Sequence, residues 1–197
     1  MKNLKKVIVA ASLCAAIGAT AVAGTLAYFT DESETKTNVF TVGDLDITLN
    51  EVWNAEDGVN IVPGRDIVKT PDVTLTGVDG YLRVDVDITA KNSEQQDALN
   101  ALLANNSIKI DYNTNAWEKV GDYYYYKTVM TAGTTEDLFT KVEIADELDD
   151  ELEGISGGFD IVLKAYGVQE EGFEASKYEG NVLNAAKAAF AATFDKE

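Results

Sequence analysis

The chain has 197 residues, which is enough for one domain of ordinary size. Hydrophobic residues make up 46% of it, so a core can form, and 34 acidic residues against 16 basic ones give a formal net charge of -18. This balance excludes nucleic-acid binding, because a phosphate backbone needs lysine and arginine to replace its counterions. Histidine is absent and Cys14 is the single cysteine. These two facts exclude histidine-activated nucleophiles, the HExxH zinc site and a disulfide within the domain.

The N-terminal residues have the pattern of an export signal. Three lysines precede an apolar stretch over residues 7–23, whose length overlaps the roughly 20 residues of a transmembrane helix. Thr25 and Ala27 place small residues at positions -3 and -1 before Tyr28, as in a signal peptidase site. We therefore predict a cleaved signal peptide over residues 1–27, with cleavage between Ala27 and Tyr28. The mature protein is expected to be secreted and free of the membrane.

From Leu45 onward, apolar and polar residues alternate with a period of two, most regularly over residues 82–89. This alternation is typical of half-buried antiparallel strands. Further strands are expected at Leu45–Leu49, Ile67–Lys69, Val73–Val78, Ile108–Tyr112, Tyr123–Met130, Leu138–Ile144 and Phe159–Val168. Turn residues separate several of them, at Pro63-Gly64, Asp79-Gly80, Gly121-Asp122 and Gly157-Gly158. Short strands with frequent turns predict an all-β fold, an antiparallel β-sandwich over residues 44–197.

Two segments have helical rather than strand periodicity. Ser93 is expected to cap a helix, with Gln96 completing a capping box and an apolar stripe of leucines following. The Ala-rich residues from Asn181 to Phe194 also have apolar side chains at helical spacing. Both helices are expected to pack on or beside the sandwich.

Two clusters leave a functional and a structural interpretation open. The acidic run contains Asp146, Glu147, Asp149, Asp150, Glu151 and Glu153. Its oxygens could bind calcium, but the spacing is not that of a calcium loop, and a solvated loop or short helix is favoured. The tyrosines from Tyr123 to Tyr126 either form a binding platform or pack across strands, and packing is again favoured.

The stretch from Gly24 to Gly43 reads GTLAYFTDESETKTNVFTVG and leads into the alternating strand at 44–49. Its elements GTLA, YFTD, Asn38 and FTVG resemble the camelysin/TasA family of secreted Gram-positive proteins, which a SipW-type signal peptidase processes. Pro63-Gly64, KTPDV at 69–73 and YLRV at 81–84 are similar to later parts of that family. Thr76-Gly77 departs from it, because many relatives have an asparagine in this turn.

The resemblance implies a jelly-roll-like sandwich that polymerises into biofilm-type fibres of the extracellular matrix or cell surface. The partner would be another copy of the chain, reached by strand addition of an N-terminal assembly segment, residues 28–43. The segment's residues singled out by the resemblance are Tyr28, Phe29, Thr30, Asp31, Asn38 and Phe40. An ordinary flexible tail is the alternative for this segment.

The alternative function is a monomeric binding module that presents tyrosines to glycans or a host surface. A secreted hydrolase is a third interpretation, because the family also carries a metallopeptidase label. A zinc site without histidine would have to consist of carboxylates or be otherwise unusual. We therefore expect no enzymatic activity, no metal and no cofactor.

Overall fold

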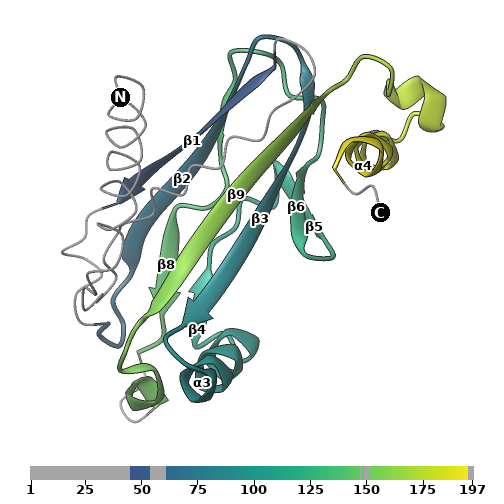
Figure 1. Ribbon diagram of the computed structural model, residues 1–197. Coiled ribbons are helices and arrows are strands. Elements are labelled where there is room, and N and C mark those ends of the chain that lie inside the picture. Colours follow the sequence, from purple (N-terminus) through teal and green to yellow (C-terminus); the bar gives the residue numbers. More distant parts are fainter. Residues whose placement is uncertain (1–44, 54–60, 147, 149–150, 195–197) are drawn as a thin grey trace, which may run out of the picture.

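The computed structural model describes residues 45–53, 61–146, 148 and 151–194 (Figure 1). The strands are β1 (Asp46–Trp53), β2 (Ile67–Thr76), β3 (Gly80–Ala90), β4 (Ile108–Ile110), β5 (Trp117–Val120), β6 (Tyr123–Tyr126), β7 (Thr135–Asp137), β8 (Lys141–Ile144) and β9 (Phe159–Gln169). The helices are α3 (Ser93–Ala104) and α4 (Val182–Thr193), with 3-10 turns η1 (Glu151–Ile155) and η2 (Ala175–Tyr178). None of the helices in these ranges has the length and apolar character needed to cross a membrane.

The strands form two antiparallel sheets. Sheet I has the order β1-β2-β8-β4, with β7 also paired to β2, and sheet II has the order β5-β6-β3-β9. The chain passes from one sheet to the other between β2 and β3, between β3 and β4, and again after β4, β6 and β8. The predicted all-β sandwich with accessory helices is confirmed.

The core lies between the two sheets and follows the period of two. On β2 the alternating residues Ile67, Val73 and Leu75 are each at most 1% exposed, whereas their neighbours on the other face are half-buried or exposed. Each such side chain contributes roughly 1.5–3 kcal/mol when it is buried. Trp117 is anchored in this core by its indole N–H, which donates to the carbonyl of Asp137 at 3.0 Å.

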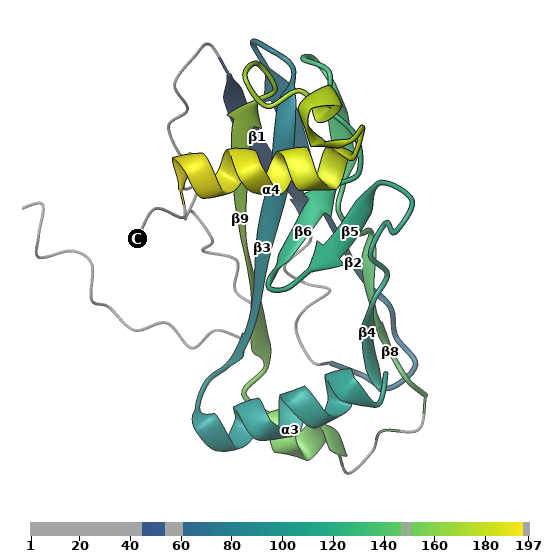
Figure 2. The ribbon, with the colours of Figure 1, turned by 90° about the vertical axis from the view of Figure 1, so that its right-hand side faces the viewer.

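Helix α3 lies with η1 at one end of the sandwich (Figure 2). Its N-cap is Asn92, whose side chain accepts a hydrogen bond from the backbone N–H of Gln95. The predicted capping box from Ser93 to Gln96 is therefore wrong by one residue. The Gln96 side chain instead accepts from the N–H of Ala90 at 2.7 Å and donates to the carbonyl of Ile88 at 3.1 Å. These bonds tie the helix to the end of β3.

Helix α4 crosses the outer face of sheet II, as Figure 2 shows. It begins after the N-cap Asn181, as expected from the sequence. Its buried alanines and Phe190 form a second hydrophobic core with Tyr81, Tyr125 and Val168 of the sheet. The two faces of sheet II are thus buried against different partners.

Three strand predictions need correction. Residues 67–69 and 73–78 form most of one strand, β2, which continues through Pro71 and ends at Thr76. The single strand expected over 138–144 begins only at Lys141. The tyrosine strand ends at Tyr126, and Met130 makes only an isolated bridge with Gly80. The short strands β5 and β7 carry too little alternation to be identified from sequence.

Candidate functional site

The residues predicted to be cleaved or to assemble lie outside the described part of the chain. They are Ala27, Tyr28, Phe29, Thr30, Asp31, Asn38 and Phe40, and their roles stay predictions. What the structure does describe is the surface that such a segment would meet, namely the sheet edges.

The four sheet edges differ in length. Edge strand β4 has three residues and β5 has four, and each exposes a lysine, Lys109 and Lys119. Short edge strands with lysine are the usual protection against strand pairing. Edge strands β1, with eight residues, and β9, with eleven, are not protected by short length, and of the two only β9 carries a lysine, Lys164. Within the described residues, β1 pairs only with β2, and β9 pairs only with β3.

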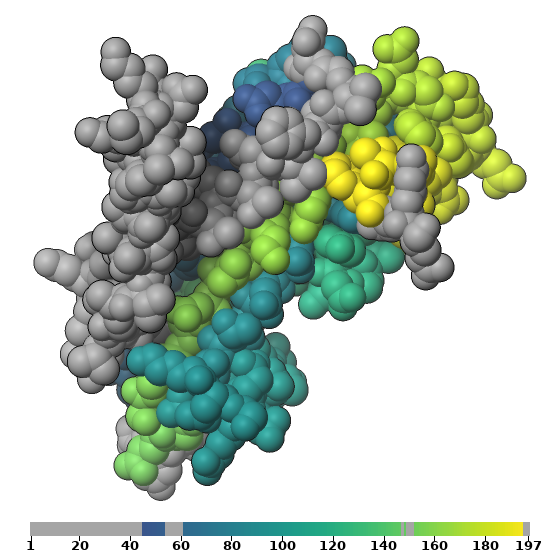
Figure 3. Space-filling view, in the orientation of Figure 1, coloured from purple at the N-terminus to yellow at the C-terminus, as the bar shows by residue number. Residues whose placement is uncertain are grey.

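The two long edges lie on the same side of the sandwich and meet at one end. A Cβ added to Gly167 of β9 would lie 2.4 Å from Cδ1 of Ile47, and one added to Gly80 would lie 2.6 Å from Cδ1 of Leu45. At this end glycine therefore lets β1 pack against sheet II. Figure 3 shows β9 at the molecular surface between the α3 and α4 ends.

Near α3, the inward-facing side chains of β1 and β3 are less completely buried than those at the opposite end of these strands. Leu49 of β1 and Val86, Ile88 and Ala90 of β3 are only partly buried, although they pack against the main core. The inner face of the sandwich thus keeps accessible apolar surface near the free edges. Such surface is what an added strand would bury.

A charged pair lies in the same region of the inner face. Lys69 of β2 forms an ion pair with Glu51 of β1, and their side chains are only 10% and 20% exposed. The Lys69 ammonium also lies 5.2 Å from the centre of the Trp53 ring. Inward-pointing charges beside an edge strand limit which strands can pair there, because an apolar partner would leave them less solvated.

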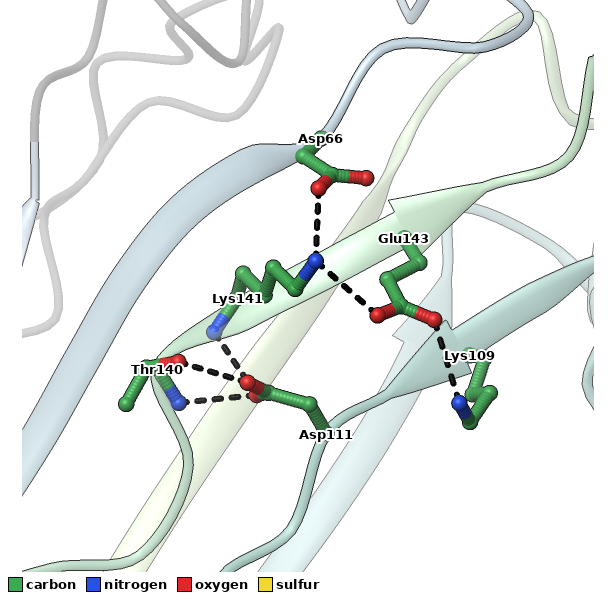
Figure 4. Close-up of polar contacts among 6 residues, drawn as sticks. All are labelled: Asp66, Lys109, Asp111, Thr140, Lys141 and Glu143. Carbon is green, nitrogen blue, oxygen red and sulfur yellow. Dashed lines mark hydrogen bonds and ion pairs between the residues drawn. The ribbon is translucent and has the colours of Figure 1, made fainter.

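A second polar cluster lies on sheet I, around its strands β8 and β4 (Figure 4). Lys141 Nζ lies 2.7 Å from an oxygen of Asp66 and 3.0 Å from one of Glu143, and Lys109 Nζ lies 3.1 Å from the other oxygen of Glu143. Asp66, Lys109, Lys141 and Glu143 also border a shallow cavity of about 350 Å³. The cluster is exposed, so its ion pairs contribute little stability.

The charges in this cluster remain fixed near neutral pH. Hydrogen bonds with Asp66 and then with Glu143 raise the pKa of Lys141 above its ordinary value. Hydrogen bonds from Lys141 and then Lys109 lower the pKa of Glu143. A general acid or base works best with a pKa near the operating pH. Both shifts lead away from that range, so these groups are unsuited to proton transfer.

The tyrosine strand packs on both of its faces. Tyr124 stacks on Tyr112 with ring centroids 4.2 Å apart in the main core, and Tyr125 meets Phe190 of α4 edge-on at 5.9 Å. Tyr124 and Tyr125 are each 6% exposed. The structural interpretation of this strand is confirmed, and these side chains are not displayed as a platform.

Of the acidic run, Asp146, Glu153 and the backbone of Glu151 belong to the described residues, whereas Glu147, Asp149 and Asp150 do not. Residues Glu151–Ile155 form the 3-10 turn η1. Within the described residues, no three Asp, Glu or Cys side chains lie close enough together to hold a metal ion. The question of a calcium site in this run stays open where the prediction left it.

The fold and these edges define an all-β sandwich protein with two long strand edges on one side. The family described as camelysin metallo-endopeptidase matches residues 3–196, and the chain belongs to this family. The resemblance found in the sequence is therefore confirmed. Comparisons with curated proteins and with solved structures find no match.

The family description implies a catalytic metal, so the donor residues must be compared with what such a metal needs. Catalytic zinc is held mainly by histidine, with carboxylate or cysteine as further ligands. This chain has no histidine, and its one cysteine is Cys14 in the apolar N-terminal stretch. The carboxylates of Asp66 and Glu143 are both ion-paired with Lys141. The described residues therefore do not fit a catalytic zinc.

Proposed function

We propose that this protein is a secreted structural protein of the bacterial extracellular matrix, exported through a SipW-type signal peptidase. Mature subunits assemble into fibres when the N-terminal assembly segment, residues 28–43, adds as a strand to the next subunit. The proposal rests on family membership for the class of protein and on the sheet edges for the mechanism. No enzymatic activity is part of it.

The observation that carries the mechanism is the placement of the two long edges. Strands β1 and β9 lie on the same side of the sandwich, and the partly buried apolar residues Leu49 of β1 and Val86 and Ile88 of β3 pack against the core beside these edges. An added strand gains ladder hydrogen bonds of about 0.5–1.5 kcal/mol each, and burial of apolar side chains adds to this. The only cysteine, Cys14, lies in the predicted signal peptide, so the mature chain has no disulfide for strengthening a matrix, and this association would have to supply the cohesion.

The binding-module alternative has less support, because the tyrosines that would form its platform are used in packing. The charge fits a matrix protein outside the cell. After the three lysines of residues 1–27 are removed, 13 basic and 34 acidic residues remain, a net of -21. A surface so acidic keeps unassembled subunits soluble and apart until a specific contact overcomes the repulsion.

Electron microscopy of the secreted protein at near-neutral pH tests this function. Fibres whose subunits are the intact mature chain are the expected result. Persistent monomers over the same range of protein concentration would contradict the proposal and would favour the binding module.

A further inference from the structure

We propose that residues 36–42 of this chain dock on the free edge of its own β1 as an additional antiparallel strand. The chain would fold back through a two-residue turn at Gly43-Asp44. This guard strand, as we call residues 36–42, is an intramolecular partner, so the proposal holds whether or not the protein polymerises. Three observations support it: the backbone direction of the described strand β1, a turn sequence that precedes β1, and the inward-facing side chains of β1 that the added strand would meet.

The first property is the direction of the backbone groups of β1. On β2, Lys69 and Leu75 donate their N–H groups away from β1, to the carbonyls of Thr140 and Thr134 at 3.1 and 3.0 Å. Backbone groups alternate along a strand, so the even-numbered residues of β2 face β1. Their partners on β1 are also even-numbered, as in the pair of Thr48 with Thr74. The odd-numbered residues of β1 therefore direct their N–H and C=O groups to the edge of the sheet that faces away from β2.

Ile47 agrees with this assignment. Its N–H donates to no strand partner within the described residues and donates instead to the side chain of Asp46 at 2.9 Å. An incoming strand would exchange this local bond for a ladder bond. The edge is thus correctly oriented, and one of its donors is held only by a neighbouring side chain.

The second property is turn chemistry that the same chain already uses. Val120-Gly121-Asp122-Tyr123 joins β5 to β6, with Val120 opposite Tyr123 and Gly121 at a φ of 62°. A positive φ at the first central residue is what a type II′ hairpin turn requires, and glycine adopts it without strain. The sequence Val42-Gly43-Asp44-Leu45 has the same chemistry directly before β1.

The direction of the backbone and the turn agree with each other. The two residues that close a two-residue hairpin exchange backbone hydrogen bonds. Leu45 must therefore direct its N–H and C=O away from β2, which is what the alternation along β1 gives. With the opposite alternation, this turn could not lead into a strand on the free edge.

The third property is the set of side chains that this turn would bring together. Val42 opposite Leu45 fixes the register, so Phe40 lies opposite Ile47 and Lys36 opposite Glu51. Leu45 and Ile47 face the core and are 6% and 7% exposed. Val42 and Phe40 would extend this apolar row, because paired residues share a face.

Lys36 would bring a positive charge beside Glu51. The buried Oε1 of Glu51 is ion-paired with Lys69 but has no hydrogen bond of normal geometry. A second cation at this point would supply a donor that a buried carboxylate needs. A register shifted by one residue would place Phe40 and Val42 on the solvent face and lose both complements.

The guard strand would change the role of the edges. It would cover β1 and would confine the part of the assembly segment that can add to a neighbouring subunit to residues 28–35, which would emerge near Trp53. The long edge left for a neighbouring subunit would then be β9.

A register-specific disulfide tests the proposal, because a Cys14→Ser background has no other thiol. Val39 and Thr48 would form a pair without mutual hydrogen bonds, with Cα atoms about 4.5 Å apart, which suits a disulfide. Val39→Cys with Thr48→Cys should therefore oxidise within one chain, at least tenfold more than the control Val39→Cys with Asn50→Cys. Both partner positions are exposed on the same face of β1, so accessibility is matched. Equal oxidation in the two variants, none in either, or disulfides only between chains would overturn the proposal.

Amide hydrogen exchange gives a second test, in which the wild-type chain, with Cys14 in place, is compared with a single variant. The N–H groups of Leu49 and Glu51 should exchange at least tenfold more slowly than in Gly43→Val, in which a β-branched residue cannot adopt the turn. Gly172→Val is the control, because Gly172 also has a positive φ, 93°, and no atom within 4 Å of an added Cβ. Exchange of Leu49 and Glu51 that is unaffected by Gly43→Val would contradict the guard strand.

Discussion

Leu138 donates its backbone N–H to the carbonyl of Pro71 at 2.9 Å, and the strand beside β2 is interrupted directly after this bond. β7 and β8 pair with β2 in one continuous register, with Asp72 opposite Asp137 and Ile67 opposite Val142. They are two parts of one line that is broken opposite Pro71. Proline has no N–H to return to the ladder, so regular pairing cannot pass this point.

The carboxylate of Asp111 replaces part of the missing ladder. It accepts the N–H of Thr140 and the N–H of Lys141, each at 2.8 Å, and the Thr140 hydroxyl at 2.5 Å. Figure 4 shows these bonds at the start of β8. We expect Asp111→Ala to lower the free energy of unfolding by about 2 kcal/mol, because charged hydrogen bonds are lost. Urea unfolding measures this, with Asp97→Ala on the exposed surface of α3 as the control; equal midpoints in the two variants would contradict the role.

The same carboxylate gives a pH dependence with a definite sign. Partial burial raises the pKa of Asp111, but hydrogen bonds from Thr140 and Lys141 outweigh burial and bring the pKa below its ordinary value. The stabilisation is then complete above the unfolded-state pKa, about 3.9, and is lost as the pH falls through the lower folded-state pKa. The stability difference between wild type and Asp111→Asn should therefore shrink as the pH falls below about 4. A difference that grows on acidification would have the wrong sign.

Arg83 is the anchor between sheet II and α4. It is 2% exposed, and its guanidinium carbon lies 4.0 Å from the ring centre of Tyr123 and 4.5 Å from that of Phe190. A planar guanidinium stacks on rings as an ammonium cannot, so Arg83→Lys should cost about 2 kcal/mol of stability. Lys119→Arg, over Tyr124 on the exposed edge, is the matched exchange and should change stability by less than about 0.5 kcal/mol. Similar thermal shifts for both would refute this anchoring.

Removal of the predicted signal peptide should give the mature protein a single, defined N-terminus. N-terminal sequencing of protein recovered from the medium should begin at Tyr28, because Thr25 and Ala27 are the small residues that a signal peptidase accepts. Ala27→Phe should reduce the yield of mature protein at least tenfold, whereas Ala23→Phe should not. A terminus several residues away, or a segment retained as an anchor, would contradict the predicted cleavage.

An assay of peptidase activity distinguishes the proposed structural function from the metallo-endopeptidase activity that the family description names. Casein should not be cleaved in a chelator-sensitive manner by the purified protein, because the chain has no imidazole to ligate zinc. The control is a histidine-containing zinc peptidase assayed under the same conditions. Activity that is lost with chelator, restored by zinc and retained through repurification would show that the expectation of a non-enzyme is wrong.

The sequence predicted the sheets where alternation was long and uninterrupted. Residues 82–89 and 159–168 lie within β3 and β9, the two longest strands. Helix α4 was predicted for the same reason, because its apolar stripe has a clear period. The fold class follows from such elements even where individual boundaries differ.

What the sequence could not predict depends on contacts between distant segments. Pro71 within β2 is tolerated only because its ring faces the break between β7 and β8, which is a property of the neighbouring strands. Asn92, not Ser93, caps α3, and the Gln96 side chain bonds to the backbone of β3, a contact that exists only once the helix and the strand are both placed. The pairing of Glu51 with Lys69 on the inner face required the register of two strands, and no local pattern indicated it.

The central claim is that the N-terminal segment joins one subunit to the next, and sedimentation of fibres tests it most directly. Deleting Tyr28 to Asn38 from the mature chain should leave a thermal unfolding transition close to that of the intact chain and abolish pelletable fibres seen by electron microscopy. Phe29→Asp should weaken fibres at least tenfold, measured as the concentration needed for assembly, whereas Thr30→Ser should not. Fibres of normal yield from the folded deletion variant would contradict strand addition, and loss of its unfolding transition would assign the segment to the subunit's own sheet.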